Sequence, residues 1–507
     1  MTPGNAGELL SRWSNDGHAH KVAIVDGLYR ITFAELLDRA ESFSASLQDR
    51  GVRPGDRVVI FLPRSAETVV AMFGTWFAGG VAVIANERLR SQQLRHVIEH
   101  SEASCIVTDD RQLRSVDLPL HAVLNIGRVE SRSARPHAAV AASDLAMLIY
   151  TSGSTGMPKG IMLSHANLLA GARIVSGYLQ LTARDVILSV LPFSFDYGLN
   201  QLLTSLLVGA TLVIQRSMFP NDISKTLLRE RITGIAGVPT FWVQLGGRHS
   251  PFLKTTYPDL RYITNSGGRF PESLVRSVRS AHPNLQIFLM YGLTEAFRST
   301  YLPPDQVDDR PSSMGKAIPE VEILVINERG ERCAPGEVGE LVHCGGTVSM
   351  GYWRDAEHTA RMFRPHPLGA GDERVVFSGD LVKTDDEGYL YYIGRKDKQI
   401  KSRGVRISPE EIERCIHSST VVAQVVSFAV PNDDGDSDIV AAVVPADPSL
   451  FREDVLSGFC RDAMPEYMQP RVFWPMTEFP LTSSGKPDRC EIERQYVAHH
   501  QHAATAS

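Results

Sequence analysis

Apolar residues up to about residue 300 switch repeatedly between a strand-like and a helix-like spacing. Short apolar runs at residues 58–62, 81–84 and 105–108 are typical of buried strands. Residues 65–78 and 91–100 instead carry the three- and four-residue apolar intervals of amphipathic helices. Strands that alternate with helices in this way predict an α/β fold with a largely parallel sheet.

Local signals mark where several elements begin or end. Asp26-Gly27 separates two strand-like runs, residues 22–25 and 29–31, and predicts a hairpin. Thr32 and Glu35 have the capping-box spacing that starts a helix. The alternation continues along the chain, with a strand predicted at 186–191, a helix at 199–207 and a strand at 210–214. Residues 111–143 are weakly patterned and predict a surface excursion.

The pattern changes after residue 314. Short strand-like runs separated by turns occupy residues 314–393 and predict a β-rich subdomain. A compact α+β unit is expected beyond a boundary near Gly394, because Ser408 and the following Pro and Glu residues are typical of a helix start. Further strands are predicted at 421–430 and 439–444, a helix at 452–463, and a frayed terminus after Val497.

Composition narrows the class of protein. At 507 residues the chain is too long for one simple core, so at least two domains are expected. Lys and Arg number 52 against 58 Asp and Glu, which gives no basic excess for a nucleic-acid partner. The six cysteines lack a C-x-x-C spacing, so neither zinc nor a disulfide framework is indicated. Neither a signal peptide nor a bilayer-spanning segment is recognisable, which predicts a soluble, cytoplasmic enzyme without a membrane partner.

The stretch Tyr150-Thr-Ser-Gly-Ser-Thr-Gly-Met-Pro-Lys-Gly160 is the first candidate site. Its glycines let successive backbone N–H groups point into one concavity, which binds anions such as phosphate. The hydroxyl groups add neutral donors, Lys159 adds a positive charge, and Ser164 is expected to cap a helix behind the loop. The stretch is not a Walker phosphate loop, because no Ser or Thr follows a Gly-Lys pair at the required spacing. By itself it also fits a flexible surface loop.

Further motifs follow this loop along the chain: Asn265-Ser-Gly-Gly268, Tyr291-Gly-Leu-Thr-Glu295, Gly351-Tyr-Trp353, Ser378-Gly-Asp380, Gly394-Arg-Lys-Asp397, Ile400-Lys-Ser-Arg-Gly404 and Ser484-Gly-Lys-Pro-Asp-Arg489. The set resembles the adenylate-forming superfamily, which includes acyl-CoA synthetases, nonribosomal peptide synthetase adenylation domains and firefly-type luciferases. The resemblance implies a large N-terminal domain (1–394) of two α/β subdomains with packed sheets plus the β-rich subdomain. It also implies a hinge at 395–398 and a small, mobile α+β C-terminal domain (399–507).

The resemblance further implies an ATP-dependent ligase. Such an enzyme joins a carboxylate to AMP, releases pyrophosphate, and passes the acyl group to a thiol. The residues implied for nucleotide binding are Thr151, Ser152, Gly153, Ser154, Thr155, Gly156, Lys159, Gly267, Gly268, Arg269, Tyr291, Gly292, Thr294, Asp380 and Arg395. Tyr291 would stack on adenine, Asp380 would accept hydrogen bonds from the ribose, and Glu295 would ligate Mg²⁺, a hard ion that prefers oxygen. These residues would neutralise and align two anionic reactants.

Lys486 completes the implied catalytic set with Lys159, Thr294 and Glu295. By resemblance it bridges the substrate carboxylate and the α-phosphate, a role that suits a point charge on a flexible stem. The C-terminal domain would then swing about Asp397 and bring the loop with Lys401 and Gly404 to the site for the thiol step.

Residues 191–198 are the most informative about the acid. Many acyl-CoA synthetases carry His at the place of Phe195, whereas adenylation domains for amino acids carry an Asp, here Asp196, that pairs with the substrate ammonium. Because a buried carboxylate needs a partner, Asp196 is predicted to recognise an amine; alternatively, it caps a helix starting near Tyr197. Arg298 pairs either with a second substrate carboxylate or with a structural acid. Further pocket candidates are Tyr197, Asn200, Ser266, Phe241 and Trp242, of which the aromatic residues are equally consistent with core positions.

The thiol acceptor is expected to be phosphopantetheine, either on a separate carrier protein or in CoA, because no carrier domain is recognisable after residue 500. The favoured prediction is a stand-alone ligase that loads an amino-bearing acid onto a carrier protein. An acyl-CoA synthetase for an aliphatic or aryl acid is the alternative. A luciferase-like oxygenase or a pseudoenzyme is a more distant one.

Overall fold

The structure is a computed structural model. It describes residues 3–14, 17–89, 91–114, 123–130, 132–151, 158–247, 250–369, 374–396, 400–402, 405–431, 437–464, 468–482 and 485–505. The chain divides into two compact units, Met1–Ile323 with His343–Val376 and Leu324–Val342 with Phe377–Ser507. The predicted domain boundary at 394 and the hinge at 395–398 stay predictions.

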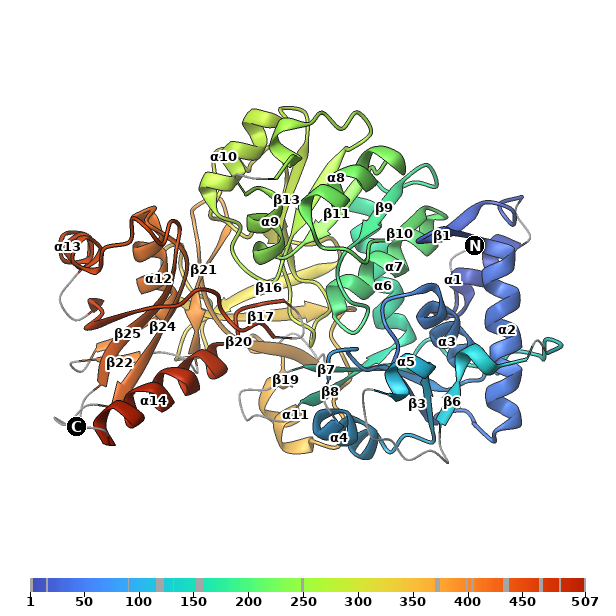
Figure 1. The fold of residues 1–507 in the computed structure, drawn as a ribbon. Helices are drawn as coiled ribbons and strands as arrows, with labels where there is room; N and C mark the ends of the chain where they lie inside the picture. Colours follow the sequence, from blue (N-terminus) through green and yellow to red (C-terminus); the bar gives the residue numbers. More distant parts are fainter. Residues whose placement is uncertain are drawn as a thin grey trace. The chain divides into compact units, whose positions relative to one another are not determined.

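A nine-stranded sheet in the first unit has the order β15-β14-β13-β12-β11-β9-β10-β1-β2 within the described residues (Figure 1). Its inner strands run parallel: β1 (Val22–Asp26), β9 (Val186–Ser189), β10 (Thr211–Ile214), β11 (Gly234–Gly237), β12 (Tyr262–Asn265) and β13 (Gln286–Tyr291). Antiparallel strands flank them: β2 (Tyr29–Thr32), β14 (Thr300–Leu302) and β15 (Lys316–Ala317). The parallel order confirms the predicted α/β class and places the carboxyl ends of β11, β12 and β13 side by side.

A second sheet of seven described strands has the order β18-β8-β7-β4-β3-β5-β6. Its parallel strands are β3 (Arg57–Ile60), β4 (Val81–Ile84), β5 (Cys105–Thr108), β6 (Val123–Asn125) and β7 (Leu145–Thr151). Two strands extend it antiparallel, β8 (Lys159–Ser164) and β18 (Gly351–Tyr352). Strand β6 lies within the stretch predicted as a surface excursion, so that prediction was wrong at these positions: three residues suffice to add a strand to a sheet edge.

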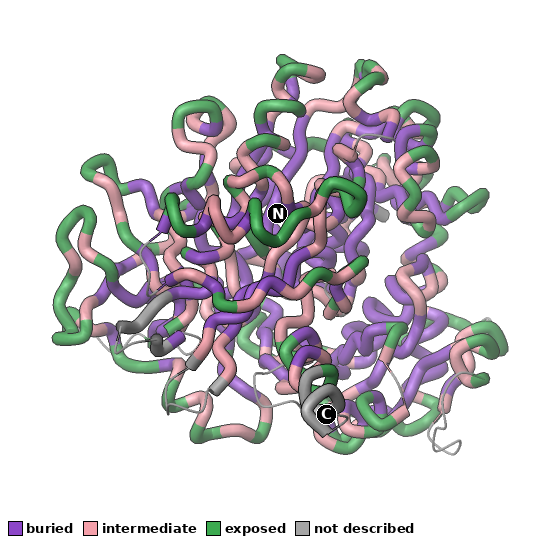
Figure 2. The backbone as a smooth tube through the Cα atoms, turned by 60° about the vertical axis from the view of Figure 1, so that its left-hand side comes forward, coloured by how far each residue is buried: buried purple, intermediate pink, exposed green. Residues whose placement is uncertain are grey.

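The helices of the first unit surround these sheets (Figure 1). They are α1 (Glu8–Ser11), α2 (Phe33–Asp49), α3 (Ala66–Phe77), α4 (Ser91–Ser101), α5 (Asp110–Leu113), α6 (His165–Tyr178), α7 (Asp196–Val208), α8 (Pro220–Arg229), α9 (Pro239–Leu245), α10 (Glu272–Ala281) and α11 (Ala356–Met362). The Thr32 capping box and the Ser164 cap form as predicted. Buried positions follow the strands and inner helix faces, and exposed positions follow the loops (Figure 2).

The β-rich region predicted at 314–393 is confirmed by a third sheet. Its strand order is β16-β17-β20-β19, with β21 paired to β20. The strands are β16 (Val321–Ile326), β17 (Gly339–Gly345), β19 (Phe363–Pro365), β20 (Arg374–Thr384) and β21 (Leu390–Arg395).

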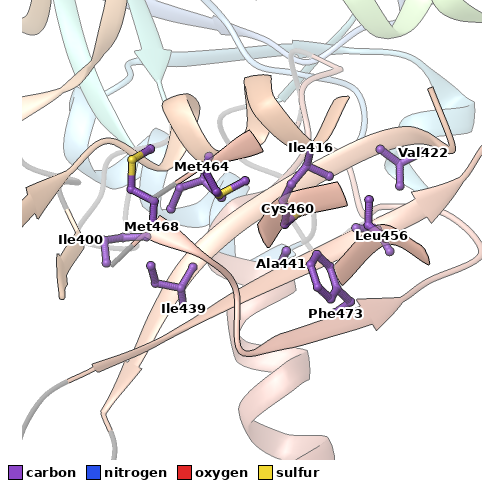
Figure 3. Close-up of a cluster of buried hydrophobic side chains, with 12 residues drawn as sticks. Ile400, Ile416, Val422, Ile439, Ala441, Leu456, Cys460, Met464, Met468 and Phe473 are labelled. Atoms are coloured by element: carbon purple, nitrogen blue, oxygen red, sulfur yellow. The ribbon is translucent and has the colours of Figure 1, made fainter. Parts of the chain in front are cut away.

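The C-terminal part has its own core. The described strands are β22 (Ile400–Ser402), β23 (Val405–Ile407), β24 (Val422–Pro431), β25 (Ser437–Pro445) and β26 (Val472–Pro475), with helices α12 (Pro409–Ser418), α13 (Glu453–Ala463) and α14 (Arg489–Thr505). Side chains from α12, α13 and the sheet gather into one apolar cluster, in which Ile416, Cys460, Ala441 and Phe473 are fully or almost fully buried (Figure 3).

One local prediction for this part is confirmed and one was wrong. Ser408 is the N-cap of α12 and Pro409 is the first residue of the helix, as predicted; the Ser408 side chain makes no capping hydrogen bond, and its hydroxyl donates to the Ile393 carbonyl oxygen. The tail after Val497 is helical as far as Thr505 rather than frayed, because α14 continues through it. Among the described residues, no helix is long and apolar enough to cross a membrane.

Candidate active site

Two antiparallel strands carry the ends of the predicted phosphate loop. Thr151 at the end of β7 lies opposite Lys159 at the start of β8. Ser152, Gly153, Ser154, Thr155 and Gly156 lie outside the described residues, so their phosphate contacts stay predictions. The Nζ atom of Lys159 lies 3.4 Å from Oδ2 of Asp355 and 6.0 Å from the ring centre of Tyr352. The loop lysine is therefore held by an acid and an aromatic ring that the sequence interpretation had not assigned to the site.

The other motifs of the first unit that are predicted to bind the nucleotide lie at the carboxyl edge of the nine-stranded sheet. Strand β12 pairs with β13, and Asn265 lies opposite Leu289. The turn after β12 supplies Ser266, Gly267, Gly268 and Arg269, and the end of β13 supplies Tyr291, Gly292 and Thr294. Gly267 has φ +81°, a conformation that favours glycine, and the Asn265 amide donates to the Gly268 carbonyl oxygen at 2.8 Å. Ligands of open α/β sheets bind at this edge.

Glu295, the predicted magnesium ligand, has a defined orientation. The Tyr352 hydroxyl donates to its Oε1 at 2.5 Å, and the Ser349 N–H donates to its carbonyl oxygen at 2.8 Å. Tyr352 lies in β18, which pairs with β8 directly after Lys159. The Gly351-Tyr-Trp353 motif was the signal in the sequence for this residue, but it did not indicate which side chain Tyr352 contacts.

A buried ion pair occupies the candidate acid pocket. Nη1 of Arg298 lies 3.4 Å from Oδ2 of Asp196, and Nη2 lies 3.4 Å from the Asp196 carbonyl oxygen. The two residues are only 2% and 3% exposed. The Arg298 guanidinium also stands 4.8 Å from the ring centre of Tyr197. The structure thus brings three predicted pocket residues together, and Arg298 has an internal acid as its partner.

Asp196 is not the N-cap of α7. The cap position is Phe195, which makes no side-chain cap bond, and the helix begins at Asp196 itself. Oδ1 of Asp196 accepts the N–H of Tyr197 at 2.9 Å, so the carboxylate does bond the first turn of the helix. An acid in this turn is also favoured by the helix dipole.

Two further polar side chains, Asn200 on α7 and Arg298 after β13, have buried donors near the candidate pocket. The Nε of Arg298 and the Nδ2 of Asn200 are buried donors without a hydrogen-bond partner among the described residues. Asn200 lines a small cavity of about 20 Å³, together with Tyr197, Thr204, Tyr262, Thr264 and Met290. That volume holds about one water. An unmatched buried donor costs about 1–3 kcal/mol, so an acceptor placed here would be stabilising.

Two of the three aromatic pocket candidates, Phe241 and Trp242, pack as core residues. Trp242 is 1% exposed, and its indole N–H donates to the Thr264 carbonyl oxygen at 3.3 Å. Its ring centre lies 4.9 Å from that of Phe241 and 5.9 Å from that of Phe270. Ser266 is likewise buried.

In the second unit, Asp380 and Arg395 lie directly opposite each other on β20 and β21. Nη1 of Arg395 is 3.1 Å from Oδ1 of Asp380 and 3.2 Å from the Ser378 carbonyl oxygen. Gly379 has φ +71°, and a Cβ atom there would lie 3.2 Å from the Arg395 guanidinium. The Ser-Gly-Asp and Gly-Arg motifs therefore lie side by side and are joined through the Arg395 side chain.

Lys486 lies in a tight turn of the same unit. The Thr482 N–H donates to the Lys486 carbonyl oxygen at 2.7 Å, and the Lys486 N–H donates to the Thr482 hydroxyl oxygen at 3.2 Å. Arg489 anchors the end of the turn to the Glu413 carboxylate at 2.7 Å. Asp397, Gly404 and the side chain of Lys401 lie outside the described parts, so the hinge and thiolation roles stay predictions.

One further cluster consists of three side chains of types that can bind a metal ion. Donor atoms of Glu322, Cys344 and His366 lie within 4.8 Å of one another. However, Nδ1 of His366 accepts the Leu368 N–H at 3.3 Å, so in the neutral ring Nε2 carries the proton and faces Glu322 at 3.8 Å. This arrangement favours an imidazole–carboxylate contact over metal ligation.

Comparison with known families agrees with this geometry. The AMP-binding enzyme family model matches residues 11–353, and the AMP-binding enzyme C-terminal domain model matches residues 411–486. The chain belongs to the AMP-binding enzyme family. It is an AMP-forming ligase of the adenylate-forming superfamily, as the motifs predicted.

Relatives of this ligase fall into two groups. A linear gramicidin synthase of Brevibacillus parabrevis is 32% identical over 92% of this chain, which spans only 6% of that protein. A solved o-succinylbenzoate CoA synthetase of Bacillus subtilis, in complex with its acyl-adenylate intermediate, is 25% identical with a TM-score of 0.85, covering 97% of this chain and 98% of that one. ATP-bound MatB of Rhodopseudomonas palustris is 27% identical with a TM-score of 0.87, covering 97% and 99%.

Proposed function

We propose that this ligase activates an amino-bearing carboxylic acid as its adenylate and transfers the acyl group to the phosphopantetheine thiol of a carrier protein. The observation that carries the proposal is the buried carboxylate of Asp196 beside the nucleotide motif. A Cβ atom on Gly292 would lie 3.3 Å from the Arg298 Cα atom, and Arg298 contacts Asp196. An acid held at Asp196 would therefore lie close to the end of β13, where the nucleotide motif begins.

The Asp196 carboxylate can bind a substrate ammonium while it also contacts Arg298. A carboxylate offers about four lone-pair positions, so it can accept bonds from both cations. The substrate's own carboxylate offsets the added positive charge. The unmatched donors on Arg298 and Asn200 favour an acid with an additional hydrogen-bond acceptor.

The first unit has residues suited to ATP and Mg²⁺. Glu295 offers the carboxylate oxygen that Mg²⁺ prefers, and Tyr352 orients it. When bound, the ion neutralises phosphate oxygens. Lys159 and Thr151 are proposed to hold the phosphates and Tyr291 the adenine. A solved o-succinylbenzoate CoA synthetase from Bacillus subtilis is described in complex with ATP and magnesium ion. Asp380, Arg395 and Lys486 are proposed to act on the same nucleotide, the last as the adenylation cation.

The test is ATP–pyrophosphate exchange with a panel of α-amino acids, β-amino acids, dicarboxylic acids and fatty acids. Exchange should be driven by an amino-bearing acid, and Asp196→Ala should abolish it. Arg64→Met, which changes a half-buried arginine of the first unit, is the control for a loss of folding alone. Exchange with fatty acids only would overturn the amino-acid assignment. Exchange with no acid would overturn the proposed ATP chemistry.

The second candidate is an acyl-CoA synthetase. It is favoured by the Arg298–Asp196 contact, which gives the carboxylate a partner without any substrate amine. The two candidates differ in the acceptor: one forms a thioester with CoA, and the other with a phosphopantetheinylated carrier protein. Mass spectrometry of both products after incubation with the exchanging acid distinguishes them.

A further inference from the structure

The segment at 349–355 is bonded to two separate parts of the phosphate end of the site. Backbone hydrogen bonds join Ser349 to Glu295, at 2.8 Å, and Trp353 to Gly160, at 2.8 Å. Tyr352 lies between them, opposite Ile161 in the β8–β18 register. One short strand therefore connects the Tyr291–Glu295 motif with the end of the phosphate loop.

Tyr352 is rigidly placed in this segment. It is 5% exposed and packs in a cluster with Ile161, Phe363 and Val376. Its ring meets His358 edge-on at 4.3 Å and Phe363 at 6.0 Å between ring centres. From this position the hydroxyl reaches the Glu295 carboxylate at 2.5 Å, while Lys159 Nζ lies 6.0 Å from the ring centre.

We propose that Tyr352 is a positioning residue for ATP binding: its hydroxyl orients Glu295 toward the metal of the nucleotide, and its ring supports Lys159. The inference rests on the proposed ATP chemistry of this site. A glutamate side chain has several rotatable bonds, and one fixed hydrogen bond removes much of that freedom before the ligand arrives. Carboxylates that bind metals are commonly held by such outer partners, whose removal typically weakens metal affinity 10–100-fold.

The experiment measures ATP binding to the full chain by calorimetry, in EDTA and over a series of Mg²⁺ concentrations. Tyr352→Phe removes the hydroxyl and keeps the ring. It should raise the Mg²⁺ concentration for half-maximal enhancement of ATP binding about tenfold, with ATP affinity in EDTA within about twofold of the wild type. Tyr352→Leu also removes the ring and should weaken ATP binding in EDTA about threefold, since an exposed cation–π contact is modest.

Tyr391→Phe is the matched control. Its hydroxyl also donates to a carboxylate, that of Asp385 at 3.0 Å, but neither residue is placed in the site. The control should leave the Mg²⁺ dependence unchanged. The inference is overturned if Tyr352→Phe matches the wild type, or if it lowers only the melting temperature while the Mg²⁺ midpoint stays in place. If the wild-type chain itself binds no ATP at any Mg²⁺ concentration, the proposed function fails instead.

Discussion

Arg298 and Asp196 form an ion pair that is almost completely withdrawn from water, with Nη1 and Oδ2 3.4 Å apart. The contact joins helix α7 to the turn after β13, and thus the proposed acid pocket to the predicted nucleotide motif. A substrate in the proposed pocket would meet a neutralised pair rather than a bare carboxylate. We therefore expect the pair to affect both stability and the choice of acid.

Replacing one member of this pair should be strongly destabilising. Arg298→Met leaves the Asp196 carboxylate buried without its cation, which is expected to lower the free energy of unfolding by about 3 kcal/mol. Adding Asp196→Asn to Arg298→Met should recover part of that loss. Urea denaturation of the two single variants and the double variant gives the coupling energy. Purely additive effects would show that the two charges do not depend on each other.

Gly171 on α6 is expected to be needed for the shape of the pocket. A Cβ atom there would lie only 2.2 Å from Cδ1 of Phe297, the residue before Arg298. Gly171→Ala should therefore displace this turn, lower stability by about 1–3 kcal/mol, and raise the KM for the acid more than the KM for ATP. Gly177→Ala on the same helix is the control, because a Cβ atom there meets nothing within 4 Å. Equal effects of the two substitutions on the acid KM would contradict the explanation.

Asp355 is expected to compete with ATP for Lys159. Its Oδ2 lies 3.4 Å from Lys159 Nζ, and both side chains are partly exposed. Asp355→Asn keeps the hydrogen bond that caps α11 through the His358 N–H but removes the charge. ATP binding should tighten about two- to threefold at low salt, and the gain should shrink at high salt because the contact is screened. A weakened affinity would instead mean that the acid positions the lysine.

His343 should make the fold sensitive to acid. Burial lowers the pKa of this imidazole to about 3, from an ordinary value of 6.5. The folded state keeps it neutral, with its ring nitrogens contacting Ser299 and Thr347, whereas the unfolded chain binds a proton below pH 6.5. The stabilisation that comes from holding His343 neutral is therefore fully present above pH 6.5 and is lost progressively toward pH 3. At pH 5 the free energy of unfolding should have fallen by about 2 kcal/mol.

The measurement is urea unfolding of the wild type and His343→Gln between pH 7.5 and 5. The variant should lose less stability over this interval than the wild type. Parallel pH profiles would mean that other groups cause the acid sensitivity.

Short-range information was sufficient for many of the elements and for the chemical class. The strands at Val81–Ile84 and Cys105–Thr108 have the predicted bounds, because continuous apolar runs indicate strands that are buried on both faces. The Thr32 capping box also forms as predicted, since its partners are adjacent in the chain. The ordered motifs identified an adenylate-forming ligase, which the family matches confirm.

Contacts between distant residues were decided only by the tertiary structure. Arg298 and Asp196 are 102 positions apart, and Tyr352 and Glu295 are 57 positions apart, so no local pattern relates them. The partner of Asp196 depends on how α7 packs beside the end of β13, and the partner of Glu295 depends on β18 joining β8. The sequence by itself determined which residue types are available for binding ATP and an acid. Folding decided which of them lie within hydrogen-bond distance, because packing and strand register bring distant segments together.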